Sequence, residues 1–377
     1  MQIPFNKPHL TGKEAHYMYD AVYTGKLSGN GKYTQQCQNF FKEKYGFGKC
    51  LLTTSCTDAL EMAAILIDIQ PGDEVIIPSY TFVSTANAFV LRGAKIIFAD
   101  SRKDHPGIDE DIIENLITKK TKAIVPVHYA GVACDMDKII DIANRYNIWV
   151  IEDAAQAIDS YYTGKDGIKR ALGSIGHLAA FSFHETKNII SGEGGMLAIN
   201  DPKFEKRAEI IWEKGTNRSA FFRGEIDKYG WVDVGSSFLP SEVIAAFLWA
   251  QLENIDSIQV KRKENWYAYW NAIVEWANIN DVQLPFIPSN ATNNAHMFYF
   301  VCKNVEQRST VLAKLKEAGV LAVFHYLSLH KSQFYSGKHD GRALPNSDYY
   351  SECLIRLPLF YDLSLEDINR VIEVLKR

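Results

Sequence analysis

Seven short apolar runs, separated by amphipathic stretches, recur through the first 200 residues of this 377-residue sequence. The runs are KCLLTT from Lys49, EVIIPS from Glu74, AKIIFAD from Ala94, TKAIVPVHY from Thr121, IWVIED from Ile148, LAAFSF from Leu178 and GGMLAIN from Gly194. Their richness in Val, Ile and Phe is typical of buried strands. Between them, residues 58–69 and 136–146 repeat apolar residues at three- and four-residue spacing, as helices that cover a sheet do. The pattern predicts an α/β fold with a seven-stranded, mostly parallel sheet.

The C-terminal third has a different pattern, which predicts a second, small α+β domain. An aromatic-rich helical stretch over residues 258–277 is followed by a proline-marked break at 284–290. Beyond it we expect a strand at 296–303, a helix at 308–319, a strand at 320–326 and a final helix at 364–377. We therefore place a large domain at residues 1–255 and a small domain at 256–377.

Charge and cysteine content exclude several classes of function. The net charge is −4 with a pI near 6.2, and Lys and Arg are spread along the chain, which argues against nucleic-acid or membrane-surface binding. No apolar run approaches the roughly 18 residues that span a bilayer, and the N-terminus lacks a signal-peptide pattern. The six cysteines are scattered, without metal-ligand spacing, so we expect reduced thiols, a cytoplasmic protein and no metal site.

Polar residues directly after the apolar runs have the first claim to function, because α/β sheets bind ligands beyond the carboxyl ends of their strands. After the run from Lys49, the residues Ser55, Cys56, Thr57 and Asp58 open the next predicted helix. Free N–H groups and the positive end of the helix dipole favour phosphate binding there. The same residues also fit an ordinary helix N-cap.

Two acids and a lysine follow two other runs. Glu152 and Asp153 end the run from Ile148, and Lys187 follows the run from Leu178. A buried carboxylate needs a partner: an arginine, helix N–H groups, or the pyridine nitrogen of pyridoxal phosphate (PLP), which an ionised acid keeps protonated. A desolvated lysine becomes a nucleophile, although an isolated lysine is usually a solvated surface charge. The joint occurrence of phosphate turn, acid and lysine at strand ends predicts a PLP site.

These motifs resemble the PLP-dependent nucleotide-sugar aminotransferase family. The resemblance is carried by EDAAQ from Glu152, FSFHETKN from Phe181 and GEGG from Gly192, and extends to PFNKP, PSYTFVSTANAF, VPVHYAG, HMFY, VFHYLSLH and RLPLF. It covers nearly the whole chain and implies the aspartate aminotransferase-like fold (fold type I).

The resemblance also implies roles for individual residues. Lys187 would hold the cofactor covalently and carry protons, and Asp153 would pair with the ring nitrogen. The other implied cofactor contacts are Gln156 near the phenolic oxygen, Phe82 stacked on the ring, and Cys56, Thr57 and Ser182 at the phosphate. Substrate contacts are implied for Phe5, Asn6, His325, Tyr326 and His330.

Within the family, the motifs are most similar to those of enzymes that aminate dTDP-4-oxo-6-deoxyglucose at C4 with glutamate as donor. This similarity implies a dTDP-4-amino-4,6-dideoxyhexose product for surface polysaccharide. Amination at C3, or of a GDP- or UDP-linked sugar, is the alternative. A sugar dehydratase of the same fold would carry His in place of Lys187, and a Rossmann oxidoreductase would need a GxGxxG motif that the turn after the first run lacks.

One segment departs from the family pattern. Many members have an Asn-x-Arg sequence that reaches the cofactor phosphate of the neighbouring subunit, whereas this chain has GSSFLPSE from Gly235, with Ser237 at the Asn position and Leu239 at the Arg position. A serine retains one hydrogen-bond donor. We expect a homodimer whose active sites include Ser237 of the neighbouring subunit.

Overall fold

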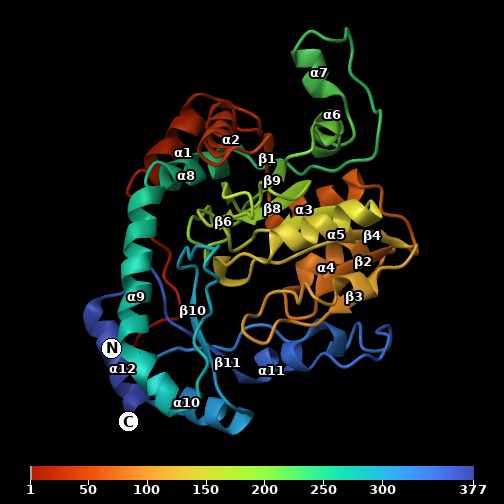
Figure 1. Cartoon of the computed structure of the whole chain (residues 1–377). Helices are drawn as coiled ribbons and strands as arrows, with labels where there is room; N and C mark the ends of the chain where they lie inside the picture. Colours follow the sequence, from red (N-terminus) through yellow and green to blue (C-terminus); the bar gives the residue numbers. More distant parts are fainter. Residues whose placement is uncertain (1) are drawn as a thin grey trace.

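A seven-stranded sheet forms the centre of the protein, seen in Figure 1 in a computed structural model that describes residues 2–377. Its strands are β1 (Lys49–Thr53), β2 (Glu74–Pro78), β3 (Lys95–Ala99), β4 (Thr121–Ile124), β5 (Trp149–Asp153), β8 (Leu178–Ser182) and β9 (Gly195–Ile199), in the order β1-β9-β8-β5-β4-β2-β3. Only β9 runs antiparallel to its neighbours. All seven apolar runs are strands of this sheet, which confirms the predicted α/β fold.

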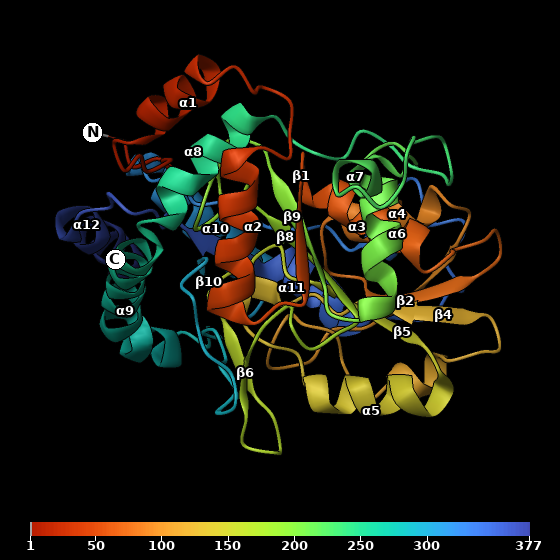
Figure 2. The same cartoon turned by 90° about the horizontal axis from the view of Figure 1, so that it is seen from above.

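Helices cover both faces of the sheet, because successive strand residues point to opposite sides. Leu52 packs into one apolar core with α2 (Lys32–Tyr45), α5 (Met136–Tyr146) and α8 (Glu242–Leu252). Its neighbour Leu51 packs into a second core with α3 (Cys56–Leu66), α4 (Val83–Val90) and α6 (Glu205–Trp212). Figure 2 shows the two helical layers on either side of the strands, with α1 (Glu14–Tyr23) beside α8. The parallel strands are therefore buried on both faces.

The C-terminal third builds a third apolar core below the sheet in Figure 1. The long helix α9 (Ile255–Ile279) packs against an antiparallel pair, β10 (Phe298–Val301) and β11 (Leu354–Leu357). The remaining helices there are α10 (Val305–Glu317), α11 (Pro345–Cys353) and α12 (Leu365–Lys376). The division into domains at residue 255 stays a prediction.

The strand predicted at residues 320–326 does not form. This segment makes only isolated bridges, from Val320 to Ile3 and from Val323 to Arg356. The partner of β10 is β11 instead, a strand that was not predicted as one. After Val323 the chain leaves the sheet, and it brings His325 and Tyr326 into a cavity described below.

Shorter elements complete the chain. They are a hairpin of β6 (Tyr161–Thr163) and β7 (Lys169–Ala171), the helix α7 (Arg218–Phe222), and 3₁₀ turns at Ile113–Leu116, Tyr129–Gly131, Pro202–Phe204 and Leu329–Lys331. Helix α7 lies on an arm that projects from the top of the molecule in Figure 1. The arm comprises residues 213–237 and is closed at its base by the bridge between Glu213 and Ser237. Within residues 2–377, no helix has the length and apolar character needed to cross a bilayer, and no group of three or more potential ligands is arranged to hold a metal ion.

Candidate active site

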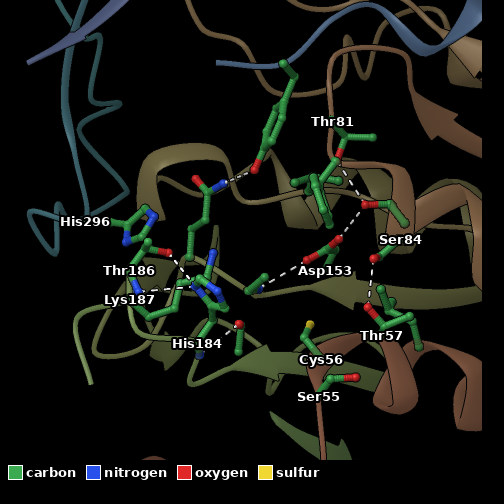
Figure 3. Close-up of a pocket in the computed structure, with 18 of the residues that line it drawn as sticks. Ser55, Cys56, Thr57, Thr81, Ser84, Asp153, His184, Thr186, Lys187 and His296 are labelled. Atoms are coloured by element: carbon green, nitrogen blue, oxygen red, sulfur yellow. Dashed lines mark hydrogen bonds between the residues drawn. The ribbon is translucent and has the colours of Figure 1, made fainter. Parts of the chain in front are cut away.

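A cavity of about 420 Å³ lies at the carboxyl ends of the parallel strands (Figure 3). Asp153 and Ser182 are the last residues of β5 and β8, and the turn after β1 leads directly into the first residues of α3. The C-terminal third contributes His296, His325, Tyr326 and Arg356 to the wall. Residues far apart in the sequence therefore meet at the edge where α/β sheets bind ligands.

Lys187 is held in the tight connection between β8 and β9. Its backbone N–H donates to the carbonyl of His184 at 2.8 Å, and the hairpin is closed by the N–H of Ser191, which donates to the carbonyl of Phe183 at 2.7 Å. The half-buried side chain lines the cavity beside Thr186 (Figure 3). Burial lowers the pKa of Lys187 to about 8, and the charge of Arg356 acts in the same direction. The amine therefore has an accessible neutral, nucleophilic form near neutral pH.

Asp153 points into the same cavity from the end of β5 and is buried (Figure 3). One carboxylate oxygen accepts from the hydroxyl of Thr85 at 2.7 Å, and the other accepts from the N–H of Ala155 at 3.1 Å. Burial raises the pKa of Asp153, while these two donors and the charge of Lys187 oppose that rise. The carboxylate is thus oriented by Thr85 and Ala155, has no arginine partner among residues 2–377, and faces a space large enough for a ligand.

Glu152, the other strand-end acid, has a different environment. Its fully buried carboxylate accepts from the N–H groups of Gly173 at 2.6 Å and Ile175 at 2.8 Å, and it pairs with the ring of His128 at 2.8 Å. Backbone N–H groups, of the kind expected as one possible partner of a buried acid, therefore belong to Glu152, and His128 is a partner that was not expected. This residue holds the loop after β7 and does not line the cavity.

The first turn of α3 offers donors to an anion. The side chain of Ser55 caps the helix by accepting from the N–H of Asp58 at 3.1 Å, so the predicted N-cap is present. The N–H groups of Cys56 and Thr57 precede the first intrahelical bond, as in every helix start. The Thr57 hydroxyl lies 2.7 Å from that of Ser84, and Ser182 lines the cavity nearby. Capping and anion binding are compatible here, because the cap uses a different N–H group.

Aromatic and amide side chains also line the cavity. Phe82 precedes α4 with 55 % of its surface exposed, and its ring centroid lies 6.0 Å from that of Tyr326. The Gln156 amide donates to the Tyr326 hydroxyl at 2.9 Å and accepts from the N–H of Ala130 at 2.6 Å. An exposed aromatic face next to a cavity suits a flat, conjugated ligand.

Two histidines in the wall have a lowered pKa. His325 stacks on Tyr326 with ring centroids 3.6 Å apart and bonds to the Tyr129 hydroxyl at 2.6 Å. His296 is buried and bonds to the side-chain oxygen of Asn188 at 2.9 Å. Burial holds the pKa of both histidines well below the usual value, and the positive charges of Lys187 and Arg356 lower it further.

Most of the predicted residues meet in this cavity. Those that line it are Lys187, Asp153, Cys56, Thr57, Phe82, Gln156, Ser182, His325 and Tyr326. Phe5 and Asn6 lie behind it, in a small crevice shared with Thr186, His296 and Arg356. Ser237 is exposed on the arm, where a contact with a neighbouring subunit stays a prediction.

His330 does not reach the cavity. Its ring is buried and bonds to the Ser79 hydroxyl at 2.7 Å, with Asp348 at 3.6 Å from its other ring nitrogen. The substrate contact expected from the sequence is therefore not available to this side chain in the observed arrangement. Its local hydrogen bonds account for its position.

Several lining residues were not predicted. Thr85 and Ser84 stand in the motif PSYTFVSTANAF, and His296 and Arg356 open the motifs HMFY and RLPLF, so each was quoted without a role. Thr85 positions Asp153, which only the packing of α4 against the sheet reveals. Arg356 reaches the cavity from β11, more than 150 residues after Lys187 in the chain.

The donor set fits PLP. The helix start supplies N–H donors for a phosphate, Asp153 supplies an acceptor for a protonated ring nitrogen, Lys187 supplies an amine, and Phe82 supplies an aromatic face. Close packing also shapes the phosphate turn: a Cβ added to Gly195 would lie 2.3 Å from the carbonyl carbon of Ser55 and 2.4 Å from the nitrogen of Cys56.

Comparison with known proteins agrees with this site. The protein MJ1066 of Methanocaldococcus jannaschii, whose function is uncharacterized, is 30 % identical over 384 residues, covering 100 % of this chain and 97 % of that protein. The aminotransferase TlmJ from Streptoalloteichus hindustanus has 26 % identity and a TM-score of 0.90, covering 100 % of this chain and 98 % of that structure. The PLP form of Spr1654 from Streptococcus pneumoniae, which carries a sugar aminotransferase assignment, has 25 % identity and a TM-score of 0.89, with the same coverage.

The profile of the DegT/DnrJ/EryC1/StrS aminotransferase family matches residues 8–376, nearly the entire chain. A conserved fold, a cavity with the donor set for PLP and a full-length family match all point to one conclusion. The chain belongs to the DegT/DnrJ/EryC1/StrS aminotransferase family and is a PLP-dependent sugar aminotransferase.

Proposed function

We propose that this enzyme transfers the amino group of glutamate to the C4 keto group of dTDP-4-oxo-6-deoxy-D-glucose. The product would be a dTDP-4-amino-4,6-dideoxyhexose for surface polysaccharide, made in the cytoplasm. The observation that carries the proposal is the meeting of the Lys187 amine, the Asp153 carboxylate and the open turn of α3 in one cavity. The identity of the sugar is supported by the sequence motifs alone.

In this proposal, a named residue contacts each part of the cofactor. Cys56, Thr57 and Ser182 would hold the phosphate, and Asp153 would hold the ring nitrogen. The remaining contacts would be Phe82 on the ring face, Gln156 at the phenolic oxygen and Ser237 from the neighbouring subunit. When bound, PLP supplies an electron sink that stabilises negative charge on the substrate carbon.

Lys187 would carry the protons. Its Nζ atom, with a pKa of about 8, is able to take a proton from the glutamate Cα and to return a proton to the sugar carbon that receives nitrogen. The exchange is balanced: glutamate becomes 2-oxoglutarate, and the keto sugar becomes an amino sugar. Proton transfer by a positioned side chain contributes roughly 10²- to 10⁴-fold to the rate of such steps.

An absorbance spectrum tests the cofactor assignment. The purified holoenzyme is expected to show a visible band from PLP bound to Lys187, and glutamate should bleach it. Lys187→Ala should abolish the band and all turnover while leaving the circular dichroism spectrum unchanged. Lys165→Ala is the matched control, because Lys165 is exposed on the β6–β7 hairpin. Turnover by Lys187→Ala would refute the role of this lysine.

The sugar is tested by supplying the 4-oxo and 3-oxo isomers separately and locating the new amine by NMR. We expect amination at C4 of the dTDP-linked 4-oxo sugar. Amination at C3 alone, or a preference for a GDP- or UDP-linked sugar, would refute the substrate but would leave the aminotransferase activity in place.

A further inference from the structure

Arg356 is a cation of the cavity wall to which the proposed mechanism gives no task. It lies on β11, where its backbone pairs with Val323, and its side chain lines the cavity together with Lys187. The guanidinium carbon lies 4.6 Å from the centre of the Phe5 ring. This contact fixes the apolar side of the guanidinium and leaves its N–H edge for other partners.

Within residues 2–377, no carboxylate forms an ion pair with this arginine or is among the groups that shift its pKa. Its buried Nε has no hydrogen-bond partner, and burial lowers the pKa of Arg356. A buried charge without a counter-ion is costly to a folded protein. An orphaned donor in a ligand cavity therefore indicates that the ligand brings the anion.

The charge of Arg356 acts on the reacting region itself. It lowers the pKa of Lys187, and it lowers the pKa of His296 and His325, which stand in the same wall. Figure 3 shows His296 and Lys187 on the same side of the cavity. Because Arg356 and Lys187 line one cavity, an anion bound to Arg356 would share that cavity with the carbon from which Lys187 removes a proton.

The two substrates differ in that respect. In glutamate the α-carboxylate is bonded directly to the carbon that loses its proton. In the keto sugar, the carbons on either side of C4 carry no charge, and the diphosphate is attached to C1, across the ring. A cation in the same cavity as Lys187 thus matches the α-carboxylate of the donor, whereas the only anion of the acceptor lies across the ring from its reacting carbon.

We infer that Arg356 binds the α-carboxylate of the amino donor and thereby selects an α-amino acid for the first half of the reaction. The inference rests on the proposed function only in taking glutamate as that donor. The walls formed by His325, His296 and Tyr326 would receive the sugar in the second half.

The two half-reactions separate this role from other roles of Arg356. In Arg356→Gln, bleaching of the visible band by glutamate should lose about 10- to 100-fold in kcat/KM, the range expected for a charged hydrogen bond. Recovery of the band when the keto sugar is added to the amine form should stay within about 3-fold of wild type. Arg356→Lys should fall between the two enzymes, because it keeps the charge but not the paired donors.

A binding measurement gives a readout independent of turnover. Glutarate, which has carboxylates but no amine, should bind the wild-type holoenzyme and bind Arg356→Gln about 10-fold more weakly in calorimetry. Arg308→Gln is the matched control, because the Nε of Arg308 is also buried and has no partner within residues 2–377. Arg308 does not line the cavity but a second one next to it, which Leu327 and Asp348 also line. This variant should leave both half-reactions and glutarate binding unchanged.

Glutamate 1-amide, in which the α-carboxylate is neutral, completes the test. Wild type should prefer glutamate over the amide, and Arg356→Gln should lose that preference. Should Arg356→Gln not fold, the same comparison is made with Arg356→Lys, where the preference should shrink. An unchanged preference, or loss confined to the sugar half-reaction, would overturn the inference. A wild-type enzyme that glutamate does not bleach would refute the proposed donor, and one bleached by glutamate but inert to the 4-oxo sugar would refute only the proposed acceptor.

Discussion

Burial determines the acidity of Lys187 more than any single neighbour does, because desolvation is the largest influence on its pKa. Desolvation disfavours the ammonium form, and Arg356 adds repulsion. Asp153 opposes both effects but stands in a cavity wall where its charge is already shared with Thr85 and Ala155. The cavity therefore prepares the amine for its chemistry before any cofactor binds.

The pKa of about 8 for Lys187 predicts how the cofactor-free enzyme captures PLP. Only the neutral amine attacks the aldehyde, so the capture rate should rise with pH and level off above about 8, whereas an ordinary lysine would level off only above roughly 10.4. The measurement is stopped-flow absorbance of the apoenzyme mixed with PLP between pH 6 and pH 10. A midpoint near 10 would contradict the burial argument, and Lys187→Ala should give no signal at any pH.

The two neighbouring acids predict opposite phenotypes. Asp153→Asn should lower turnover by several orders of magnitude and weaken PLP retention, with little change in stability, because this carboxylate faces the ligand space. Glu152→Gln should instead destabilise the fold by about 2–4 kcal/mol, because its carboxylate accepts from Gly173 and Ile175 and pairs with His128. Urea unfolding and steady-state rates measured on both variants distinguish these effects. A catalytically dead, fully stable Glu152→Gln enzyme would reverse the assignment.

The part of the site that was predictable from sequence is the part at strand ends. Lys187, Asp153 and the turn at Cys56 each follow an apolar run within a few residues, so the sheet rule places them together. Arg356 follows no such rule, because it reaches the cavity from a separate two-stranded sheet. The position of His330 depends on buried hydrogen bonds of its ring and its backbone N–H to the Ser79 hydroxyl, which no local pattern encodes.

Among the strands, too, some were predictable from the sequence and others were not. The seven central strands were predictable because each is buried on both faces and reads as a continuous apolar run. Segment 320–326 has the composition of a strand, but it pairs with β11 only at Val323 and then turns toward the cavity with His325 and Tyr326. Apolar composition indicates a tendency to extend, whereas tertiary contacts decide whether the segment pairs along its length.

The packing of β9 against the start of α3 predicts the effect of one added methyl group. Gly195→Ala would place its Cβ against the backbone of Ser55 and Cys56, which must then shift and misplace the N–H groups of the phosphate turn. We expect a stability loss of about 1–3 kcal/mol and weaker PLP binding. Gly337→Ala is the control, because nothing lies within 4 Å of its added Cβ. Thermal unfolding and PLP titration of both variants test this, and wild-type PLP affinity in Gly195→Ala would contradict it.

On the scale of the whole molecule, several of the exposed apolar side chains lie on α1 and on the arm. Tyr19 and Tyr23 of α1 are 66 % and 78 % exposed, and on the arm Phe222 is 68 % and Trp231 is 85 % exposed. Helices α1 and α7 both lie at the top of the molecule in Figure 1. The same arm leads to Ser237, the residue proposed to reach a neighbouring cofactor. Exposed aromatic side chains of this kind are available for a contact with a second protein chain.

The arm therefore predicts the assembly of the enzyme. We expect a homodimer in light scattering after size-exclusion chromatography, because a two-fold pair would bury these aromatic side chains against a second copy. Trp231→Asp should place a charge in that contact, dissociate the dimer and reduce both PLP retention and turnover, since each cavity would lose Ser237 of its neighbour. Ile279→Asp is the control: Ile279 is 82 % exposed, but it ends α9, away from the arm. A monomeric wild-type enzyme with full activity would refute the shared site, and a dimeric, fully active Trp231→Asp enzyme would place the contact elsewhere on the surface.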